Sequence, residues 1–191
     1  GTTRGMGNGD TLMSGDLENR IQALEAEVQR LRAREEIIHT FNQYLYGADT
    51  GYEEDILDTF SESAVLDVLN FPPDGKDMHF EGKEAIAPLY ERYRSKRSII
   101  AGGHTTSNIS IVVDETASTA TLSAYFTTTR PVGVQGGRYE GRLQLEEDGR
   151  WRFTELSIIS AWGWKADVEK ISDPVNADRS RFGGRPAAGS S

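Results

Sequence analysis

Residues 136–158 read GGRYEGRLQLEEDGRWRFTELSI, and this stretch decides the fold. From Arg138 to Glu146, charged or polar residues alternate with residues suited to a buried face, which is typical of a half-buried strand. The predicted buried face carries Tyr139, Gly141, Leu143 and Leu145. Asp148-Gly149 is a strong hairpin signal, and residues 151–162 read as the returning strand. The stretch therefore predicts an antiparallel hairpin.

Two further strands precede this hairpin, and helices precede them. The strands are residues 105–113 and residues 119–129, the second of which is dense in β-branched side chains. Upstream, the sequence predicts helices at 16–45, 52–60 and 83–95, a strand at 64–69 and a loop at 71–76. Helices followed by an antiparallel meander predict an α+β fold, in which the helices cover one face of a curved sheet.

The first helix carries a heptad pattern near its start. Asp16 is the predicted N-cap. Apolar residues then follow at alternating spacings of four and three: Leu17, Ile21, Leu24, Val28 and Leu31. In a coiled coil, β-branched Ile and Val at one apolar heptad position and Leu at the other favour a parallel dimer. The alternative is one amphipathic helix that packs on its own domain. After Arg34 the apolar positions shift, which predicts a change of partner along the helix.

Length and composition indicate one domain with appendages. The 191 residues divide into a disordered segment at 1–15, a helical extension at 16–34, a domain at 35–172 and a flexible Gly/Pro/Ser-rich tail at 173–191. The formal net charge of −9 argues against a nucleic-acid partner. No apolar run approaches the roughly 20 residues that cross a bilayer, and no signal-peptide pattern opens the sequence. We expect a cytoplasmic protein without membrane contact.

A histidine and a carboxylate are the candidate chemical pair. His104 lies at the mouth of a predicted strand, in the stretch GGHTTSN at 102–108, and Asp49 ends the first predicted helix. An Asp can orient a His and stabilise its charged form, so the pair can move a proton. The alternative is that His104 is a hydrogen-bonded polar residue at a strand start and Asp49 only a helix end.

Five segments together resemble the SnoaL-like branch of the NTF2-like superfamily. They are RLRAREEIIHTFNQYLYGAD, EEDILDTFSESAVLDV, FEGKEAI, GHTTSN and the hairpin stretch above, and their order spans residues 17–164. The resemblance implies a cone in which N-terminal helices pack on a strongly curved, mostly antiparallel sheet that encloses an apolar pocket. The family includes polyketide cyclases, scytalone dehydratase, bile-acid dehydratases, a dehydrochlorinase, steroid isomerases and non-catalytic small subunits of ring-hydroxylating dioxygenases. Its enzymes typically use no metal or organic cofactor, so we expect none here.

The resemblance also assigns roles to individual residues. It implies that His104 is the general acid or base and that Asp49 fixes its tautomer. Tyr44, five residues before Asp49, would donate a hydrogen bond to a substrate oxygen. Tyr46 is the competing candidate, and about 200° of helix separates the two tyrosines. For either of them, packing in the core is the alternative.

Other residues are candidates for the pocket wall. Asn108 is four residues after His104, so a regular strand would put both on one face; its alternative is a local backbone hydrogen bond. Tyr125, Tyr139 and Trp162 are candidate wall residues, with ordinary core packing as the alternative. Residues 123–127 read SAYFT and lack the second carboxylate that some dehydratases of the family have. His39 and His79 show no metal-ligand spacing, so we expect no metal site.

Two functions are compatible with these residues. The first is a cofactor-independent lyase or isomerase that acts by His/Asp acid–base catalysis on an apolar, ring-containing small molecule, through dehydration, cyclisation or double-bond migration. The second is a non-catalytic ligand-binding or accessory module. The heptad seam adds a homo-oligomer, a dimer or trimer, to the expected partners.

Overall fold

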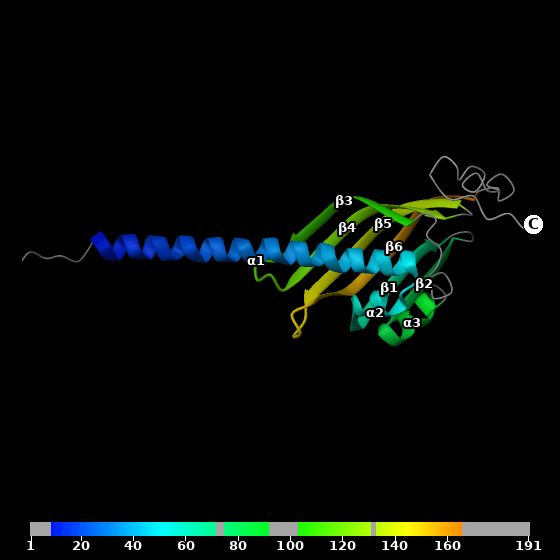
Figure 1. Ribbon diagram of the computed structural model, residues 1–191, viewed down its shortest axis with the longest axis horizontal. Coiled ribbons are helices and arrows are strands. Elements are labelled where there is room, and N and C mark those ends of the chain that lie inside the picture. The colour runs from blue at the N-terminus through cyan, green and yellow to red at the C-terminus, as the bar shows by residue number, and fades with distance from the viewer. Residues whose placement is uncertain (1–8, 72–74, 92–102, 131–132, 166–191) are drawn as a thin grey trace, which may run out of the picture.

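The structure is a computed structural model that describes residues 9–71, 75–91, 103–130 and 133–165. Its elements in chain order are α1 (Gly9–Thr50), α2 (Glu53–Asp58), β1 (Phe60–Phe71), β2 (Lys76–Glu81), α3 (Lys83–Glu91), β3 (Gly103–Val113), β4 (Thr119–Arg130), β5 (Gly133–Leu145) and β6 (Trp151–Lys165). The helices lie on one face of a six-stranded sheet (Figure 1). The predicted α+β class is confirmed.

The strand order is β2-β1-β6-β5-β4-β3. Strands β3 to β6 form the predicted antiparallel meander, and β1 joins it parallel to β6. At the β5–β6 hairpin, Gly149 takes a φ of 79° and its N–H donates to the carbonyl of Glu146. The Asp-Gly signal is therefore confirmed as a turn.

Strand β2 was not predicted. Its sequence, KDMHFE, is short and mostly polar, and it pairs antiparallel with β1 at the edge of the sheet. The predicted loop at 71–76 leads into it, although residues 72–74 lie outside the described residues. An edge strand needs no alternating apolar face, so its sequence carries little β signal.

Helix α1 is longer than predicted at both ends, and Asp16 lies inside it rather than at its N-cap. The helix also includes residues 9–15, which were predicted to be disordered, and crosses the predicted domain boundary at residue 34 without a break. The first part of the predicted disordered segment (1–8), the end of the third predicted helix (92–95) and the C-terminal tail (173–191) lie outside the described residues.

The core forms between the helices and the inner face of the sheet. Along β5, Tyr139, Gly141 and Leu143 are buried as the alternation predicts, whereas Leu145 is 39% exposed at the strand end. Phe41 of α1 meets Tyr139 edge to face, with ring centroids 5.4 Å apart. Such pairs stabilise a core beyond the area that they bury. This contact fixes α1 across the strands that carry the candidate site.

An ion-pair network fastens α2 to the β5–β6 turn. The Arg152 guanidinium donates to the Glu146 and Asp148 carboxylates and to the backbone carbonyl of Asp58. Burial alone would raise the pKa of the Asp58 carboxyl. Hydrogen bonds, chiefly from Gln43 and Arg150, outweigh burial and lower this pKa below its usual value. The network holds the end of α2 against the β5–β6 end of the sheet.

Candidate active site

Asp49 and His104 meet between the end of α1 and the start of β3. The Nδ1–H of His104 donates to Asp49 Oδ1 at 2.7 Å, and the backbone N–H of His104 donates to Asp49 Oδ2 at 2.9 Å. The side chains are 10% and 21% exposed, respectively. One carboxylate thus holds both the ring and the backbone of the histidine, and the two segments singled out in the sequence lie together.

The local sequence explains how the carboxylate can approach so closely. Helix α1 ends at Thr50, and Gly51 follows with a φ of 79°, which places Asp49 in the last helical turn. On the other side, Gly103 has a φ of 151°, and a Cβ there would lie 2.8 Å from Asp49 Oδ2. A side chain at position 103 would therefore push the carboxylate away.

This hydrogen bond assigns the histidine tautomer. Because an ionised carboxylate only accepts, Nδ1 carries the proton and Nε2 of the neutral ring keeps a lone pair. Within residues 9–71, 75–91, 103–130 and 133–165, Nε2 has no hydrogen-bond partner. The arrangement leaves one ring nitrogen able to accept a proton, with a carboxylate behind it to stabilise the imidazolium.

The imidazole lines a cavity between the helices and the inner face of the sheet. Most of the lining is apolar or aromatic: Tyr44, Ala48, Val68, Phe71, Leu89, Tyr90, Phe126, Tyr139 and Ile158, together with the polar Gln135. The volume is about 40 Å³, whereas one water molecule has a share of about 30 Å³ in the liquid. As the side chains lie, the space beside His104 admits only a small group.

Tyr44 reaches this cavity as one half of a hydroxyl pair. Its ring is buried, and its hydroxyl lies 2.9 Å from the hydroxyl of Tyr90 on α3. One hydroxyl donates to the other, so the pair, and not Tyr44 alone, is the candidate donor to a ligand oxygen. Tyr46 is 70% exposed and lies outside the cavity lining, consistent with the predicted angle between the two side chains.

A row of polar side chains crosses the inner face beside the histidine. His104 pairs directly with Thr128 on β4, and Thr128 pairs directly with Gln135 on β5. Directly paired residues share a face, with Cβ atoms about 5 Å apart. Thr128 is 2% exposed, and its hydroxyl has no hydrogen-bond partner among the described residues. A buried hydroxyl without a partner is uncommon and indicates a place for a ligand or water oxygen.

The candidate wall residues divide into two groups. Tyr139 is buried and lines the cavity. Tyr125 and Trp162 are 55% and 52% exposed and do not line it. Tyr125 is adjacent to the inward-facing Phe126 on β4, so the strand alternation directs it outward. Trp162 lies over Gly136, where the missing Cβ leaves room for the indole.

Asn108 is also outside the cavity, because β3 is irregular. Its pairing with β4 shifts register between Ser107 and Ser110, and Asn108 takes a φ of 51° within the shift. The prediction that Asn108 shares a face with His104 assumed a regular strand and is wrong. Asn108 is instead exposed, and left-handed backbone is a conformation that Asn tolerates better than most residues.

Sequence reasoning missed Tyr90, Thr128 and Gln135. Tyr90 falls in the helix predicted at 83–95, where nothing in the sequence indicates a hydroxyl pair with Tyr44. Thr128 belongs to the run TTT at 127–129; alternation from Phe126 places it on the inner face, but only strand pairing shows that it lies beside His104. Gln135 lies before Arg138, where the strand was predicted to begin, although β5 starts at Gly133. An earlier start for that strand would have put Gln135 on the same face as Tyr139.

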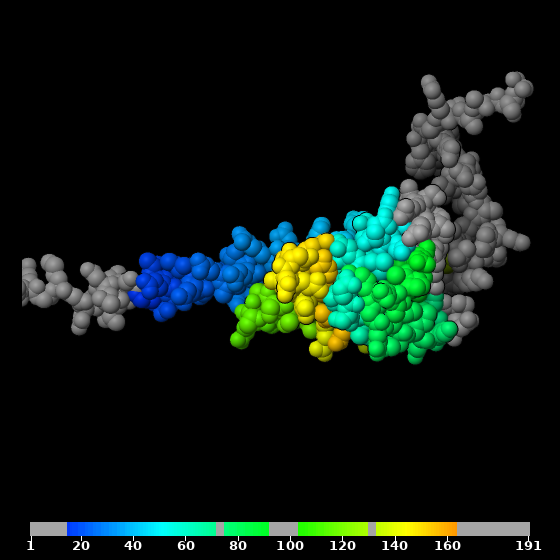
Figure 2. Space-filling model, turned by 90° about the horizontal axis from the view of Figure 1, so that it is seen from below, coloured from blue at the N-terminus to red at the C-terminus, as the bar shows by residue number. Residues whose placement is uncertain are grey.

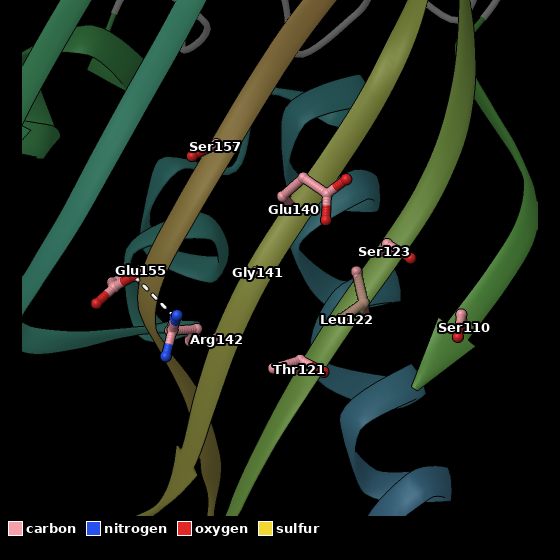
Figure 3. Close-up of a pocket in the computed structure, with 9 residues that line it drawn as sticks. All are labelled: Ser110, Thr121, Leu122, Ser123, Glu140, Gly141, Arg142, Glu155 and Ser157. Carbon is pink, nitrogen blue, oxygen red and sulfur yellow. Dashed lines mark ion pairs between the residues drawn. The ribbon is translucent and has the colours of Figure 1, made fainter. Parts of the chain in front are cut away.

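A second hollow lies on the opposite face of the sheet. It has a volume of about 290 Å³ and is lined by hydroxyl and charged side chains of β3 to β6 (Figure 3). Arg142 and Glu155 form an ion pair at 3.2 Å across it. This hollow is larger than the inner cavity, but its charged groups are exposed and it contains no histidine. The inner cavity is therefore the better candidate for chemistry.

The described residues contain no cluster of three or more His, Asp or Glu side chains that could hold a metal ion. Over the same part of the chain, no helix is both long and apolar enough to span a bilayer.

Comparison with known proteins places the chain in a family. A family model described as the SnoaL-like domain matches residues 29–157, which include α1 from Gln29 onward, both members of the Asp49–His104 pair and the sheet as far as Ser157 in β6. The chain belongs to the SnoaL-like domain family. No curated protein matches it.

Three solved structures show that this SnoaL-like protein has the NTF2-like fold. A scytalone dehydratase-like protein of Novosphingobium aromaticivorans is 21% identical, with a TM-score of 0.57 over 76% of this chain and 93% of the other. Hexachlorocyclohexane dehydrochlorinase LinA-type3 of Novosphingobium barchaimii is 16% identical, with a TM-score of 0.60 over 73% and 94%. An NTF2-like protein with a cystatin-like fold, also from N. aromaticivorans, is 20% identical, with a TM-score of 0.53 over 88% and 99%. Dehydratases and dehydrochlorinases therefore stand among the distant relatives, beside proteins of unknown function.

Proposed function

We propose that this SnoaL-like protein is a cofactor-independent lyase or isomerase in which His104 is the general base. The observation that carries the proposal is the imidazole on the cavity wall, with Nδ1 bound to Asp49 and Nε2 without a partner among the described residues. A histidine held in this way can remove a proton from carbon and return it to a second atom. Relatives named for dehydration and dehydrochlorination support the same class of chemistry.

The proposed step begins at a carbon next to a carbonyl group. Nε2 takes the proton, and the electrons of the C–H bond form a C=C bond as a β-hydroxyl group leaves. The imidazolium then gives its proton to that hydroxide, which departs as water. Without a leaving group, return of the proton to a different carbon moves a double bond. Asp49 stabilises the imidazolium throughout, and the Tyr44–Tyr90 pair donates to the carbonyl oxygen as it gains charge.

The cavity limits the substrates that the site can accept. With about 40 Å³ beside the imidazole, a ring fits only if part of the wall moves. Phe71, Leu89 and Ile158 are the half-buried apolar members of the lining, so they are the side chains that a ring would displace. Thr128 and Gln135 supply polar groups beside His104, which favours a substrate with an oxygen near the reacting carbon. The proposed substrate is a small cyclic ketone with a β-hydroxyl group or a β,γ double bond.

Deuterium exchange tests the shared first step. Small cyclic β-hydroxy ketones and β,γ-unsaturated ketones are incubated with the protein in D₂O, and NMR follows the hydrogens next to the carbonyl. The protein should accelerate their exchange, and His104→Ala should reduce the rate by about 10²–10⁴-fold. His79→Ala is the matched control, because it removes an exposed histidine outside the cavity. Equal exchange by His104→Ala and the unaltered protein would reject the mechanism.

The same experiment distinguishes the alternative function. A ketone that shifts cavity resonances of Tyr44 or Tyr139 without any exchange would favour a binding module over an enzyme.

A further inference from the structure

The N-terminal part of α1 extends beyond the rest of the domain in two perpendicular views (Figures 1 and 2). Its heptad residues do not pack on the domain. Each is between 45% and 66% exposed: Leu17, Ile21, Leu24, Val28 and Leu31. The alternative considered from the sequence, a helix that buries this stripe against its own sheet, is therefore not what the structure shows. Five large apolar side chains on one projecting helix face need an explanation.

The exposed stripe and the domain-facing residues occupy opposite sides of one helix. The buried side chains of this helix include Ala33, Ile37, Phe41, Tyr44 and Ala48. At 3.6 residues per turn, the mean direction of the stripe lies about 160° from the mean direction of these buried residues. A second helix laid along the stripe would thus meet no part of the sheet, and the two domains would lie on outer, opposite sides of the helix pair.

The charges beside the stripe match a parallel copy of the same helix. With Ile21 and Val28 at position a, Arg20 and Glu27 occupy g, and Glu25 and Arg32 occupy e. In a parallel pair each g residue faces the e residue five positions further along the other chain. Arg20 would then face Glu25 of the second copy, and Glu27 would face Arg32 of the second copy. Both contacts join opposite charges.

An antiparallel pair is less favourable. There, e residues face e residues and g residues face g residues. The register that sets Ile21 level with Leu24 of the second copy brings Glu18 opposite Glu25. Like charges at this position repel, and the attraction between Arg20 and Glu27 at g only offsets that contact. β-branched residues at a with Leu at d also favour two parallel strands. We propose that residues 17–31 of α1 form a parallel two-stranded coiled coil with a second copy of this chain, and that the two catalytic domains project away from it.

The next seam position limits the length of the coil. Glu35 occupies position a, where two carboxylates would face each other across the seam. The tight part of the coil therefore ends near Leu31, after about two heptads. A coil this short predicts a reversible dimer whose population depends on concentration. Each Asp49–His104 pair remains within its own domain, so the dimer does not complete the proposed catalytic site.

Sedimentation equilibrium of the full chain over a wide range of concentrations tests this arrangement. The unaltered protein should move from monomer to dimer. Leu24→Glu should weaken the dimer by about a thousandfold, because both copies lose a buried leucine, and the melting of the domain should not change. Gln22→Glu, which adds the same charge at an exposed position off the stripe, is the control and should leave the dimer intact. Glu35→Ile should tighten the dimer.

Charge reversal tests the direction of the helices. Arg20→Glu should weaken the dimer by about tenfold, because it sets two like-charge contacts in place of two ion pairs. Adding Glu25→Arg should restore the dimer. Adding Glu27→Arg instead should weaken a parallel dimer further, because both g–e contacts then join like charges, but it would restore an antiparallel dimer, in which Arg20 faces Glu27. The proposal is overturned by a protein that stays monomeric at all concentrations, by a Leu24→Glu dimer as tight as the original, by failure of Arg20→Glu/Glu25→Arg to recover, or by recovery of Arg20→Glu/Glu27→Arg.

Discussion

Two histidines in this protein are held by carboxylates, in opposite surroundings. His104 Nδ1 binds Asp49 Oδ1 at 2.7 Å, and both side chains are largely buried at the inner cavity. His79 Nδ1 lies 2.6 Å from Asp67 Oδ1 in the β1–β2 hairpin, and its ring is 56% exposed. Hydrogen-bond length therefore does not distinguish a catalytic candidate from a surface ion pair.

The second ring nitrogen does distinguish them. His79 Nε2 lies 3.1 Å from Glu81 Oε1, so each ring nitrogen of His79 faces a carboxylate. This arrangement favours the protonated ring, in which both nitrogens donate. These carboxylates, Asp67 first and Glu81 second, raise the pKa of His79 above its ordinary value. The His104 ring has one carboxylate partner and lines the inner cavity, and its Nε2 has no hydrogen-bond partner among the described residues. Acid–base chemistry needs that remaining nitrogen and a site that excludes bulk water.

The largest expected effect comes from the carboxylate behind His104. Asp49→Asn keeps the side-chain shape but can present an amide N–H to Nδ1, which favours the wrong tautomer and no longer stabilises the imidazolium. We expect the rate of deuterium exchange to fall by about 10²–10⁴-fold. Asp67→Asn is the matched control at the exposed pair and should leave the rate unchanged. Equal rates for Asp49→Asn and the original protein would make Asp49 structural only.

Gly103 tests the placement of the same carboxylate by steric means. Gly103→Ala puts a Cβ about 2.8 Å from Asp49 Oδ2 at a backbone angle that side chains rarely adopt. We expect a loss of about 1–3 kcal/mol in the free energy of unfolding and a rate lowered by about 10–100-fold as the pair shifts.

Gly149→Ala is the control for Gly103→Ala. Gly149 also has a positive φ, of 79°, but no atom lies near its missing Cβ. This variant should lose about 1 kcal/mol of stability from the backbone alone and keep its rate. If both variants keep full activity, close placement of Asp49 is not needed.

Thr128 separates function from stability. Thr128→Val replaces a buried hydroxyl that has no partner among the described residues with a methyl group of similar shape. Removal of an unsatisfied group should raise the melting temperature by about 2–4 °C, while binding of an oxygen-bearing ketone weakens by about tenfold. Thr127→Val, at a neighbouring position that faces the other side of β4, is the control. A variant that is less stable, with unchanged ketone binding, would contradict the role of this hydroxyl.

The contrast between the two pairs also shows what the sequence could predict. Asp49 and His104 were found by family resemblance and by their places at a helix end and a strand start, and strand periodicity located Tyr139. The exposed pair joins Asp67 to His79, and the second residue of this pair lies on a strand that was not predicted. Asn108 was misplaced because a register shift breaks the two-residue period of β3. Strand alternation puts Thr128 and Gln135 on the inner face, but only pairing across three strands shows that they lie beside His104, and pairing is a property of the whole sheet.

The smallest effect is expected at His79, and it concerns stability. Because the folded pKa is raised, protonated His79 stabilises the fold fully below the unfolded value near 6.5, and this stabilisation is lost as the pH rises through the folded pKa. His79→Gln should therefore lower the melting temperature slightly at about pH 6, where Asp67 and Glu81 are still ionised, and not at alkaline pH. Thermal melts across this range measure the difference, and deuterium exchange should be unchanged throughout. A drop in exchange rate in His79→Gln would show that exposure does not exclude this second pair from the chemistry.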